Sequence, residues 1–549
     1  MKAPSLLTWA SLPSAFALNI PLQGFLSPHA ETPLPAVKPS GRETCPQAPK
    51  VELPNDGLHS SLVFLKDGAF RARQVDRLSR AVQVPTTVGD YATDPYDKAF
   101  EPFVEHINRL GLLYTFQGVD TTRKPILFTA HQDVVPIDDP SDWAHPPFEG
   151  HFDGEWLWGR GASDCKNSLI GLLSALEDLV SQGWNPQRTV LLAFGFDEES
   201  HGFLGAGSIS KFLEERYGKD SIEFLLDEGG MGLSSLGGDS DSAEEILYAL
   251  PAVGEKGNTD LVLELAVPGG HSSIPPAHTG IGIIAEILYE LERQELFTAK
   301  LDSSHPTYGK LECQARYSPE RDAESLAEAV SQSRGSRIRY TLQTSQAADL
   351  ISGGVKTNAL PEKISAIVNY RVALHQTPDL VRERAVRIIS PIAERHNISI
   401  IQKYPGVPNK PIEHPDRTLT LYSLSEPLAP APISPTDPLS SKVWARFAGV
   451  TRSVFESHPD PTKRQSSLAH GTESEEVVES VPRVVVTGDV MTGNTDTRFY
   501  WSLTENIYRW SPSREGTALN IHTVDERVQL DAHLEGIMLY YGRSYLGSY

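Results

Sequence analysis

Three clusters of acidic side chains, one of them with a histidine, each follow an apolar segment in the first half of the 549-residue chain. The clusters are His131-Gln132-Asp133, Asp197-Glu198-Glu199 and Asp227-Glu228. Packed carboxylates repel one another unless they are protonated or neutralised, and a pair of divalent cations would neutralise them. Imidazole with carboxylate and no cysteine suits zinc, manganese or cobalt, and the imidazole favours zinc over calcium or magnesium.

A fourth acidic residue, Asp164, follows a glycine-bearing segment that contains Gly159 and Gly161. Glycines let the backbone turn sharply and approach a buried centre closely. Asp164 also directly precedes a predicted helix, so a simple helix cap is the alternative interpretation. A single Asp at a strand end is usually a turn residue. The coincidence of several such groups nevertheless favours a metal site.

The elements that must position these groups alternate between strand and helix. Apolar runs at residues 126–130, 189–196 and 224–226 predict buried strands, and an apolar stripe predicts a helix at residues 168–182. This order is typical of an α/β domain with a mainly parallel sheet covered on both faces. Ligands of open α/β sheets bind outside the carboxyl ends of the strands, where the acidic clusters lie.

A different pattern begins near residue 255. Strands are expected at residues 261–267, 337–344, 364–372 and 398–403, with helices at residues 282–293 and 378–395. Strand-helix-strand-strand-helix-strand is the ferredoxin-like α+β plan. We therefore expect a smaller domain at residues 255–405. It would interrupt a catalytic domain formed by residues 56–254 and 406–549. A proline-bearing polar loop at residues 425–480 has no assigned role.

Bulk composition excludes some classes of function. The formal net charge of −22 argues against nucleic-acid binding, which needs a basic surface. Three scattered cysteines (Cys45, Cys165 and Cys313) allow at most one disulfide. Residues 1–18 resemble a signal peptide and residues 19–55 a proline-rich leader, although a frayed terminus is the alternative. No apolar run reaches the ~18 residues of a membrane span. A secreted or vacuolar protein is expected.

The acidic clusters belong to longer motifs that appear in order along the chain. These are residues 131–136, residues 159–166, Phe196-Asp197-Glu198-Glu199 and Leu226-Asp227-Glu228-Gly229. They resemble the co-catalytic zinc peptidases that include carboxypeptidase S, aminoacylase and carboxypeptidase G. The resemblance covers roughly residues 60–540 and is closest to fungal carboxypeptidase S, through residues 143–166 and 519–526. It implies a zinc-peptidase catalytic domain interrupted by a smaller lid or dimerisation domain.

The resemblance also assigns roles at the centre. It implies that His131, Asp164 and Asp227 hold one zinc ion, and that Asp164, Glu199 and His522 hold a second. Asp164 would bridge the two ions, and a cis peptide would follow it. Asp133 would orient the ring of His131, and Glu198 would be the general base that takes a proton from the attacking water.

Further roles concern the substrate. The resemblance implies that His271 stabilises the oxyanion, often from a partner subunit in a homodimer, although a turn histidine is the alternative. Asn358, Arg371 and Arg498 are candidates for binding the substrate carboxylate, with Arg498 preferred, because arginine binds carboxylates through two hydrogen bonds. Either arginine could instead form a structural ion pair.

The leading interpretation is a dizinc metallocarboxypeptidase that releases the C-terminal residue of short peptides. The same groups could hydrolyse N-acyl amino acids, as aminoacylases do, and the sequence does not separate these substrates. A binding protein that kept the fold and lost catalysis is the alternative from another class, but the complete set of ligands and Glu198 speak against it. An intracellular metal-dependent deacylase is a further alternative that depends on the leader.

Overall fold

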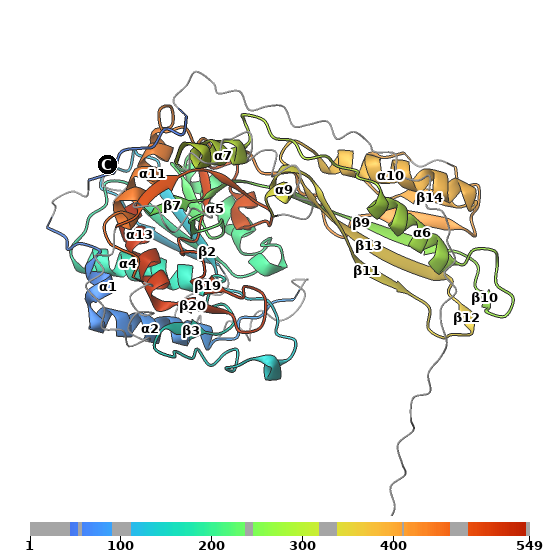
Figure 1. Cartoon of the computed structure of the whole chain (residues 1–549), viewed down its shortest axis with the longest axis horizontal. Coiled ribbons are helices and arrows are strands. Elements are labelled where there is room, and N and C mark those ends of the chain that lie inside the picture. The colour runs from blue at the N-terminus through green and yellow to red at the C-terminus, as the bar shows by residue number, and fades with distance from the viewer. Residues whose placement is uncertain are drawn as a thin grey trace, which may run out of the picture.

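Two bodies make up the part of the chain that the computed structural model describes, residues 44–52, 57–89, 111–236, 245–317, 337–408, 411–461 and 481–544. Figure 1 shows a large α/β body and, beside it, an elongated α+β body. The predicted signal peptide at residues 1–18 and most of the predicted leader lie outside the described residues. Among the described helices, none is long and apolar enough to cross a membrane.

A seven-stranded, mainly parallel sheet forms the centre of the large body, as the sequence predicts. In sheet order its strands are β1 (Leu112–Phe116), β4 (Val190–Gly195), β2 (Ile126–His131), β5 (Leu225–Asp227), β18 (Ile507–Arg509), β8 (Ala252–Glu255) and β17 (Asp489–Met491). Parallel pairing joins β4 to β2, β2 to β5, β5 to β18 and β8 to β17. The metal-ligand candidates at the ends of β2, β4 and β5 therefore share one edge of the sheet.

Helices cover both faces of this sheet, which explains why β2 and β4 are apolar at nearly every position. Phe128 and Leu192 pack into the core shared with α4 and α13, whereas Leu127 and Leu191 pack into the core shared with α5. The helices of the large body are α1 (Val63–Lys66), α2 (Gly68–Val82), α4 (Lys166–Ser181), α5 (Ala206–Tyr217), α7 (Pro306–Tyr317), α11 (Lys442–Phe455) and α13 (Leu530–Ser544). Three short 3-10 helices are η1 (Pro140–Asp142), η2 (Glu198–Ser200) and η3 (Asp496–Phe499).

Two small three-stranded sheets complete the large body. One contains β16 (Arg483–Val486), β7 (Ile246–Ala249) and β6 (Leu233–Ser234), and the other contains β19 (Ala518–Leu519), β20 (Arg527–Gln529) and β3 (Trp156–Trp158). The second sheet joins the segment before Asp164 to the segment after His522 through the antiparallel pair β3–β20. Part of the predicted loop at 425–480 is helical, because α11 lies within it and buries Trp444 and Phe447.

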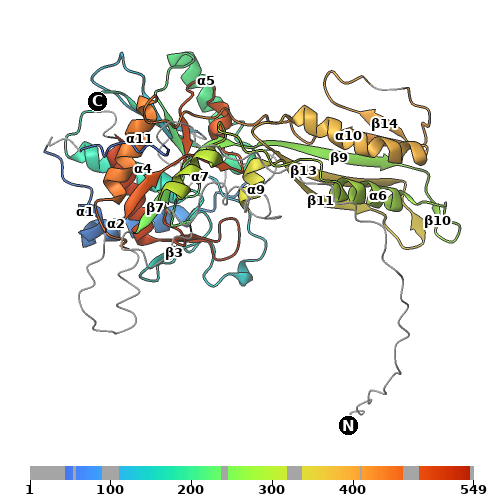
Figure 2. The ribbon, with the colours of Figure 1, turned by 45° about the horizontal axis from the view of Figure 1, so that its top comes forward.

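The elongated body has the predicted strand-helix-strand-strand-helix-strand order. Its sheet runs β11 (Ser345–Gly353), β13 (Lys363–Val372), β9 (Gly257–Ala266), β15 (Thr418–Tyr422) and β14 (Ser399–Gln402), with α6 (Gly280–Arg293) and α10 (Pro378–Arg395) packed against it. β15 is an additional strand between β9 and β14, beyond the predicted domain boundary at residue 405. A two-stranded ribbon of β10 (Gly270–His271) and β12 (Ala359–Leu360) lies at the end farthest from the large body (Figures 1 and 2).

One predicted strand is wrong. Residues 337–344 were expected to be extended, but they contain helix α9 (Arg337–Leu342), and the strand β11 begins only at Ser345. Leu342 is fully buried against Leu301 and Leu311, and the guanidinium of Arg339 bonds Gln343 one turn later. The burial of Leu342 and this local hydrogen bond stabilise a helix, and together they outweigh the preference of the segment for a strand.

A disulfide ties the first described segment to α7. Cys45 and Cys313 are bonded, whereas Cys165 is free and buried. Lys310 of α7 also forms a buried ion pair with Asp489, at 2.7 Å between Nζ and Oδ2. Helix α7 therefore lies on the large body (Figure 1), although its residues fall within the predicted smaller domain. The domain boundaries themselves stay a prediction.

Candidate metal centre

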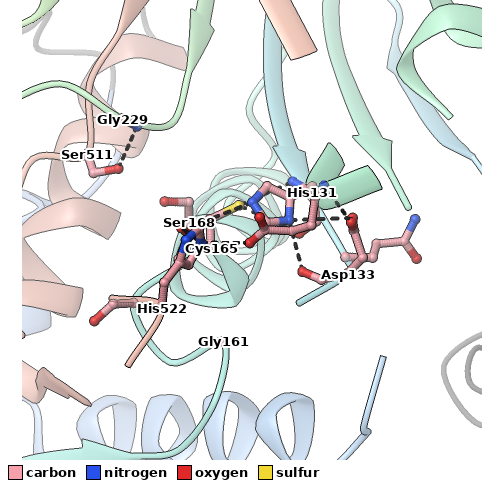
Figure 3. Close-up of polar contacts among 12 residues, drawn as sticks. His131, Asp133, Gly161, Cys165, Ser168, Gly229, Ser511 and His522 are labelled. Atoms are coloured by element: carbon pink, nitrogen blue, oxygen red, sulfur yellow. Dashed lines mark hydrogen bonds and ion pairs between the residues drawn. The ribbon is translucent and has the colours of Figure 1, made fainter. Parts of the chain in front are cut away.

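His131 ends strand β2, and its imidazole is buried between two acidic residues. Its Nε2 lies 3.0 Å from Oδ1 of Asp164, and its Nδ1 lies 2.9 Å from the backbone carbonyl of Asp133. The carboxylate of Asp133 is farther from Nδ1, at 3.5 Å, and its Oδ2 accepts a hydrogen bond from the amide of Glu199. Asp133 therefore holds the ring of His131 (Figure 3), and it also holds the turn that carries Glu199.

Asp164 lies between two histidines, one at each carboxylate oxygen. Its Oδ1 faces His131, and its Oδ2 lies 3.0 Å from Nε2 of His522. The predicted cis peptide between Asp164 and Cys165 is present. A side chain at Gly161 would meet Val134 Cγ1 at 2.6 Å, so the loop before Asp164 requires glycine there. This arrangement suits a carboxylate that bridges two cations.

The second histidine comes from the far end of the chain. Nε2 of His522 lies 2.9 Å from Oε1 of Glu199 and 3.0 Å from Asp164, so a single nitrogen faces two carboxylates. Hydrogen bonds to Asp164 and Glu199 raise the pKa of His522 to about 10. Asp164, Glu199 and His522 thus form a group that could hold a metal cation between them.

Four further carboxyl groups crowd the same region. Loss of hydration raises the pKa of Asp227, Glu228, Glu198 and Asp496, and repulsion among neighbouring carboxylates adds to the rise. Oδ2 of Asp227 is buried and has no hydrogen-bond partner in the part of the chain that is described. Such a set is costly to bury without cations, so the residues fit a pair of divalent metals.

Glu228 and Asp496 are neighbours of the centre that the sequence reasoning left without a role. After burial, Asp164 has the largest effect on the pKa of Glu228, whereas Asp227 is influenced by Glu255. Glu228 therefore lies close enough to Asp164 for the two carboxylates to repel each other. A signal was available, because Glu228 stands next to Asp227 in the same motif.

Glu526 is a third residue whose role the sequence reasoning missed. Its fully buried carboxylate accepts hydrogen bonds from the guanidinium of Arg160 and from the backbone amides of Gly161, Ser163 and Asp164, at 2.7 to 3.1 Å. It lies four residues after His522 in the chain. Glu526 therefore fixes the Asp164 loop against the segment that carries the second histidine.

We expect Glu526→Gln to lower kcat/KM by about 10- to 100-fold, because residues that orient metal ligands typically contribute that much. Metal content and peptide hydrolysis would be measured together. Glu535→Gln is a matched control, because Glu535 also forms a buried ion pair, with Arg514 at 2.7 Å. Glu535 is not one of the metal-ligand candidates. Equal losses in both variants would indicate a general loss of stability instead.

The residues predicted to contact the substrate do not all lie close together within one chain. His271 and Asn358 lie together at the far end of the elongated body, where the Asn358 carbonyl accepts from the amide of Ser272. Arg371 lies at the opposite end of β13, and its Nη1 donates to Oδ1 of Asn494 at 3.0 Å. Strand β13 alone spans roughly 30 Å at ~3.3 Å per residue.

Arg498 belongs to the large body and lies near the centre. Its guanidinium donates to the carbonyl of His201 and stands 4.7 Å from the ring centroids of Phe203 and Phe499. Burial lowers the pKa of Arg498, while nearby Asp496 and Glu198 oppose that shift. The two arginines, Arg371 and Arg498, therefore lie near the candidate metal centre. The other two residues, His271 and Asn358, lie far from it.

Comparison with known proteins identifies the family of this chain. The model of peptidase family M20/M25/M40 matches residues 127–542. The chain belongs to this family. It is 36% identical to carboxypeptidase S of Saccharomyces cerevisiae, over 93% of this chain and 91% of that protein. The family match includes all five predicted metal ligands and Glu198.

A further sequence relative and a solved structure carry the names of other activities. A zebrafish (Danio rerio) protein called N-fatty-acyl-amino acid synthase/hydrolase PM20D1.1 is 28% identical, over 86% of this chain and 85% of that protein. Human carnosine dipeptidase 1 shares the fold, with a TM-score of 0.57 and 12% identity, over 89% of this chain and 98% of that one. The M20 fold with its mainly parallel central sheet is thereby established.

Proposed function

We propose that this protein is a dizinc carboxypeptidase that hydrolyses the C-terminal amide bond of short peptides. The observation that carries the proposal is the position of Asp164 between His131 and His522, with one carboxylate oxygen toward each imidazole. A carboxylate in that position, with Glu199 beside the second histidine, suits two cations that share one ligand. The similarity to carboxypeptidase S supports peptides as substrates.

The chain's own residues would divide the reaction between them. His131, Asp164, Glu199 and His522, with Asp227 or the adjacent Glu228, would hold the two ions. Bound zinc lowers the pKa of water and polarises a carbonyl. Glu198 would take the proton from the attacking water and return it to the leaving nitrogen. Its raised pKa, caused by lost hydration and by Asp496, suits a group that must both accept and donate a proton.

The substrate carboxylate would bind the guanidinium of Arg498. This side chain lies beside Glu198 and is held by the carbonyl of His201 and by two aromatic rings. Arg371 of the elongated body and Asn494 of the large body would close the same side of the pocket. An anchor for a free carboxylate next to the scissile bond would restrict cleavage to the last residue of a peptide.

Hydrolysis of N-acyl amino acids is the second candidate, and the zebrafish relative named for such substrates favours it. Initial rates on a dipeptide panel and on matched N-acyl amino acids, with and without chelator, test both. The proposal expects kcat/KM to be higher for dipeptides, and activity to disappear with chelator and to return with zinc. A higher kcat/KM for N-acyl amino acids would instead support the second candidate function. Activity of metal-free protein would contradict both.

We also propose that two chains form a homodimer in which His271 completes the site of its partner. His271 lies at the far end of the elongated body, too distant to serve the centre of its own chain (Figure 2). Strand β11 is an edge strand of that body, and its residues Leu350 and Ile351 are 63% and 58% exposed. An exposed apolar edge of this kind favours pairing with a second copy.

Co-expression of His271→Ala chains with Glu198→Gln chains tests the shared site. Each mixed dimer would contain one complete site, so random pairing should restore about a quarter of the wild-type activity. Chains carrying both substitutions, co-expressed with Glu198→Gln chains, are the control and should restore nothing. Full activity of His271→Ala alone, or no recovery in the mixture, would contradict the proposal.

A secreted or vacuolar location is proposed for the mature protein. The disulfide between Cys45 and Cys313 supports an oxidising compartment. N-terminal sequencing of the protein from its natural source tests this location. We expect a new N-terminus downstream of residue 18. An intact Met1 would instead support the intracellular alternative.

A further inference from the structure

A second group of metal-binding side chains lies outside the candidate centre, in the loop between η1 and β3. His145, Glu149 and His151 place one ring nitrogen or carboxylate oxygen each within 4.8 Å of the others. None of these residues belongs to the candidate catalytic set. The two imidazoles are stacked with their centroids 3.9 Å apart and their planes 15° from parallel, so the two rings lie directly against each other.

The backbone of this loop is held in place by hydrogen bonds that leave the three side chains available. The amide of Glu149 donates to the carbonyl of Pro146 at 2.9 Å, and the amide of Trp158 donates to the carbonyl of His151 at 2.8 Å. Ser79 Oγ donates to the carbonyl of Gly150 at 2.6 Å. Gly150 adopts a φ of +63°, and a side chain there would collide with the Ser79 carbonyl. The loop geometry is therefore fixed before any ligand binds.

The three side chains lack competing partners. Within the described part of the chain, no hydrogen bond or ion pair engages the rings of His145 and His151 or the carboxylate of Glu149. The carboxylate of nearby Asp153 is occupied by the indole of Trp158 and two backbone amides. Two imidazoles and one carboxylate gathered in this way are the donor set that a single cation would use.

We propose that His145, Glu149 and His151 bind an additional zinc ion. Zinc takes imidazole and carboxylate ligands in tetrahedral geometry, with donor atoms about 3.3 Å from one another, so side-chain rotations that bring the donor atoms closer by at most about 1.5 Å and turn the rings toward one point would complete the site. Glu149 is exposed and would leave the fourth position to water. This proposal does not depend on the proposed function, because it uses a separate set of side chains.

The ion would stabilise a loop that supports the catalytic segment. The amide of Ala144 donates to Oδ1 of Asp525 at 2.7 Å, and the amide of Gly159 donates to the carbonyl of Glu526 at 2.8 Å. These bonds connect both ends of the loop to residues that follow His522. An ion held there by three protein ligands would therefore stabilise this loop near the surface.

Zinc content by elemental analysis, after equilibration with zinc and desalting, tests the proposal. We expect His145→Ala/His151→Ala protein to hold one zinc fewer than wild type. In an Asp164→Asn background, which should empty the candidate centre, we expect the remaining zinc to disappear when the double substitution is added. His278→Ala/His396→Ala is the matched control, because those rings also lie together, but His396 is already paired with Glu286 at 2.7 Å.

Equal zinc content in wild type and the double variant would overturn the proposal, as would an equal loss in the control. A second measurement covers the case in which the variant does not fold. Anomalous diffraction at the zinc edge from wild-type crystals should show a peak within bonding distance of His145 and His151. Absence of that peak in zinc-equilibrated crystals would also overturn the proposal.

Discussion

Replacing Glu198 with glutamine is expected to lower kcat for peptide hydrolysis by about 10²- to 10⁴-fold, the usual contribution of a general acid–base group. Glutamine keeps the shape of the side chain and removes its ability to carry a proton. Glu198 lies beside the ligand candidate Glu199 in η2, within a group of atoms that includes His131. The zinc content and the KM should therefore change little.

Steady-state kinetics on one dipeptide, together with elemental analysis, would measure this effect. Glu215→Gln is the control, because Glu215 is an exposed glutamate on α5 outside the centre, and its activity should match wild type. A folded Glu198→Gln protein that kept its metals and hydrolysed peptides at the wild-type rate would refute the role of the base. Loss of zinc in that variant would instead identify Glu198 as a metal ligand.

Replacing Asp164 with asparagine is expected to remove both catalytic zinc ions and to abolish measurable peptide hydrolysis. Asp164 is the only described carboxylate with one oxygen 3.0 Å from each of His131 and His522. Asparagine has no charge and offers one carbonyl oxygen, so the repulsion between two cations would no longer be offset. Substituting an exposed ligand such as His522 should lower the zinc content and the activity less.

Elemental analysis before and after zinc addition, with a peptide assay, would measure this loss. Asp138→Asn is the control, since Asp138 is exposed in the loop after β2. Thermal unfolding of both variants would separate metal loss from unfolding. If Asp164→Asn retained two catalytic zinc ions, the bridging role would be wrong, even if activity fell.

Local sequence determined the elements that hold most of the centre. Strands β2, β4 and β5 are buried on both faces, so their apolar runs are continuous, and their polar groups follow directly at the carboxyl ends. Parallel pairing then places His131 beside Gly195 and brings the clusters to one edge. Helix α10 was also predictable from local sequence, because Pro378 is its first residue and Thr377 caps it by accepting a hydrogen bond from the amide of Leu380.

Other features were invisible to local reasoning because they depend on long-range contacts. Strand β15 joins the elongated body only by pairing with β9 and β14, and α9 is a helix because Leu342 is buried against a distant core. The role of Glu526 required knowing that its carboxylate lies beneath the amides of the Asp164 loop.

By itself, therefore, the sequence determined which side chains could bind metal and on which strand ends they stand, since hydrophobic periodicity and strand direction are local properties. Only the tertiary structure decided their distances: Asp164 lies between two histidines, and His271 lies far from its own centre. The physical reason is that the side chains of this centre are up to several hundred residues apart in the sequence. Their distances in space are set by the packing of whole helices and strands.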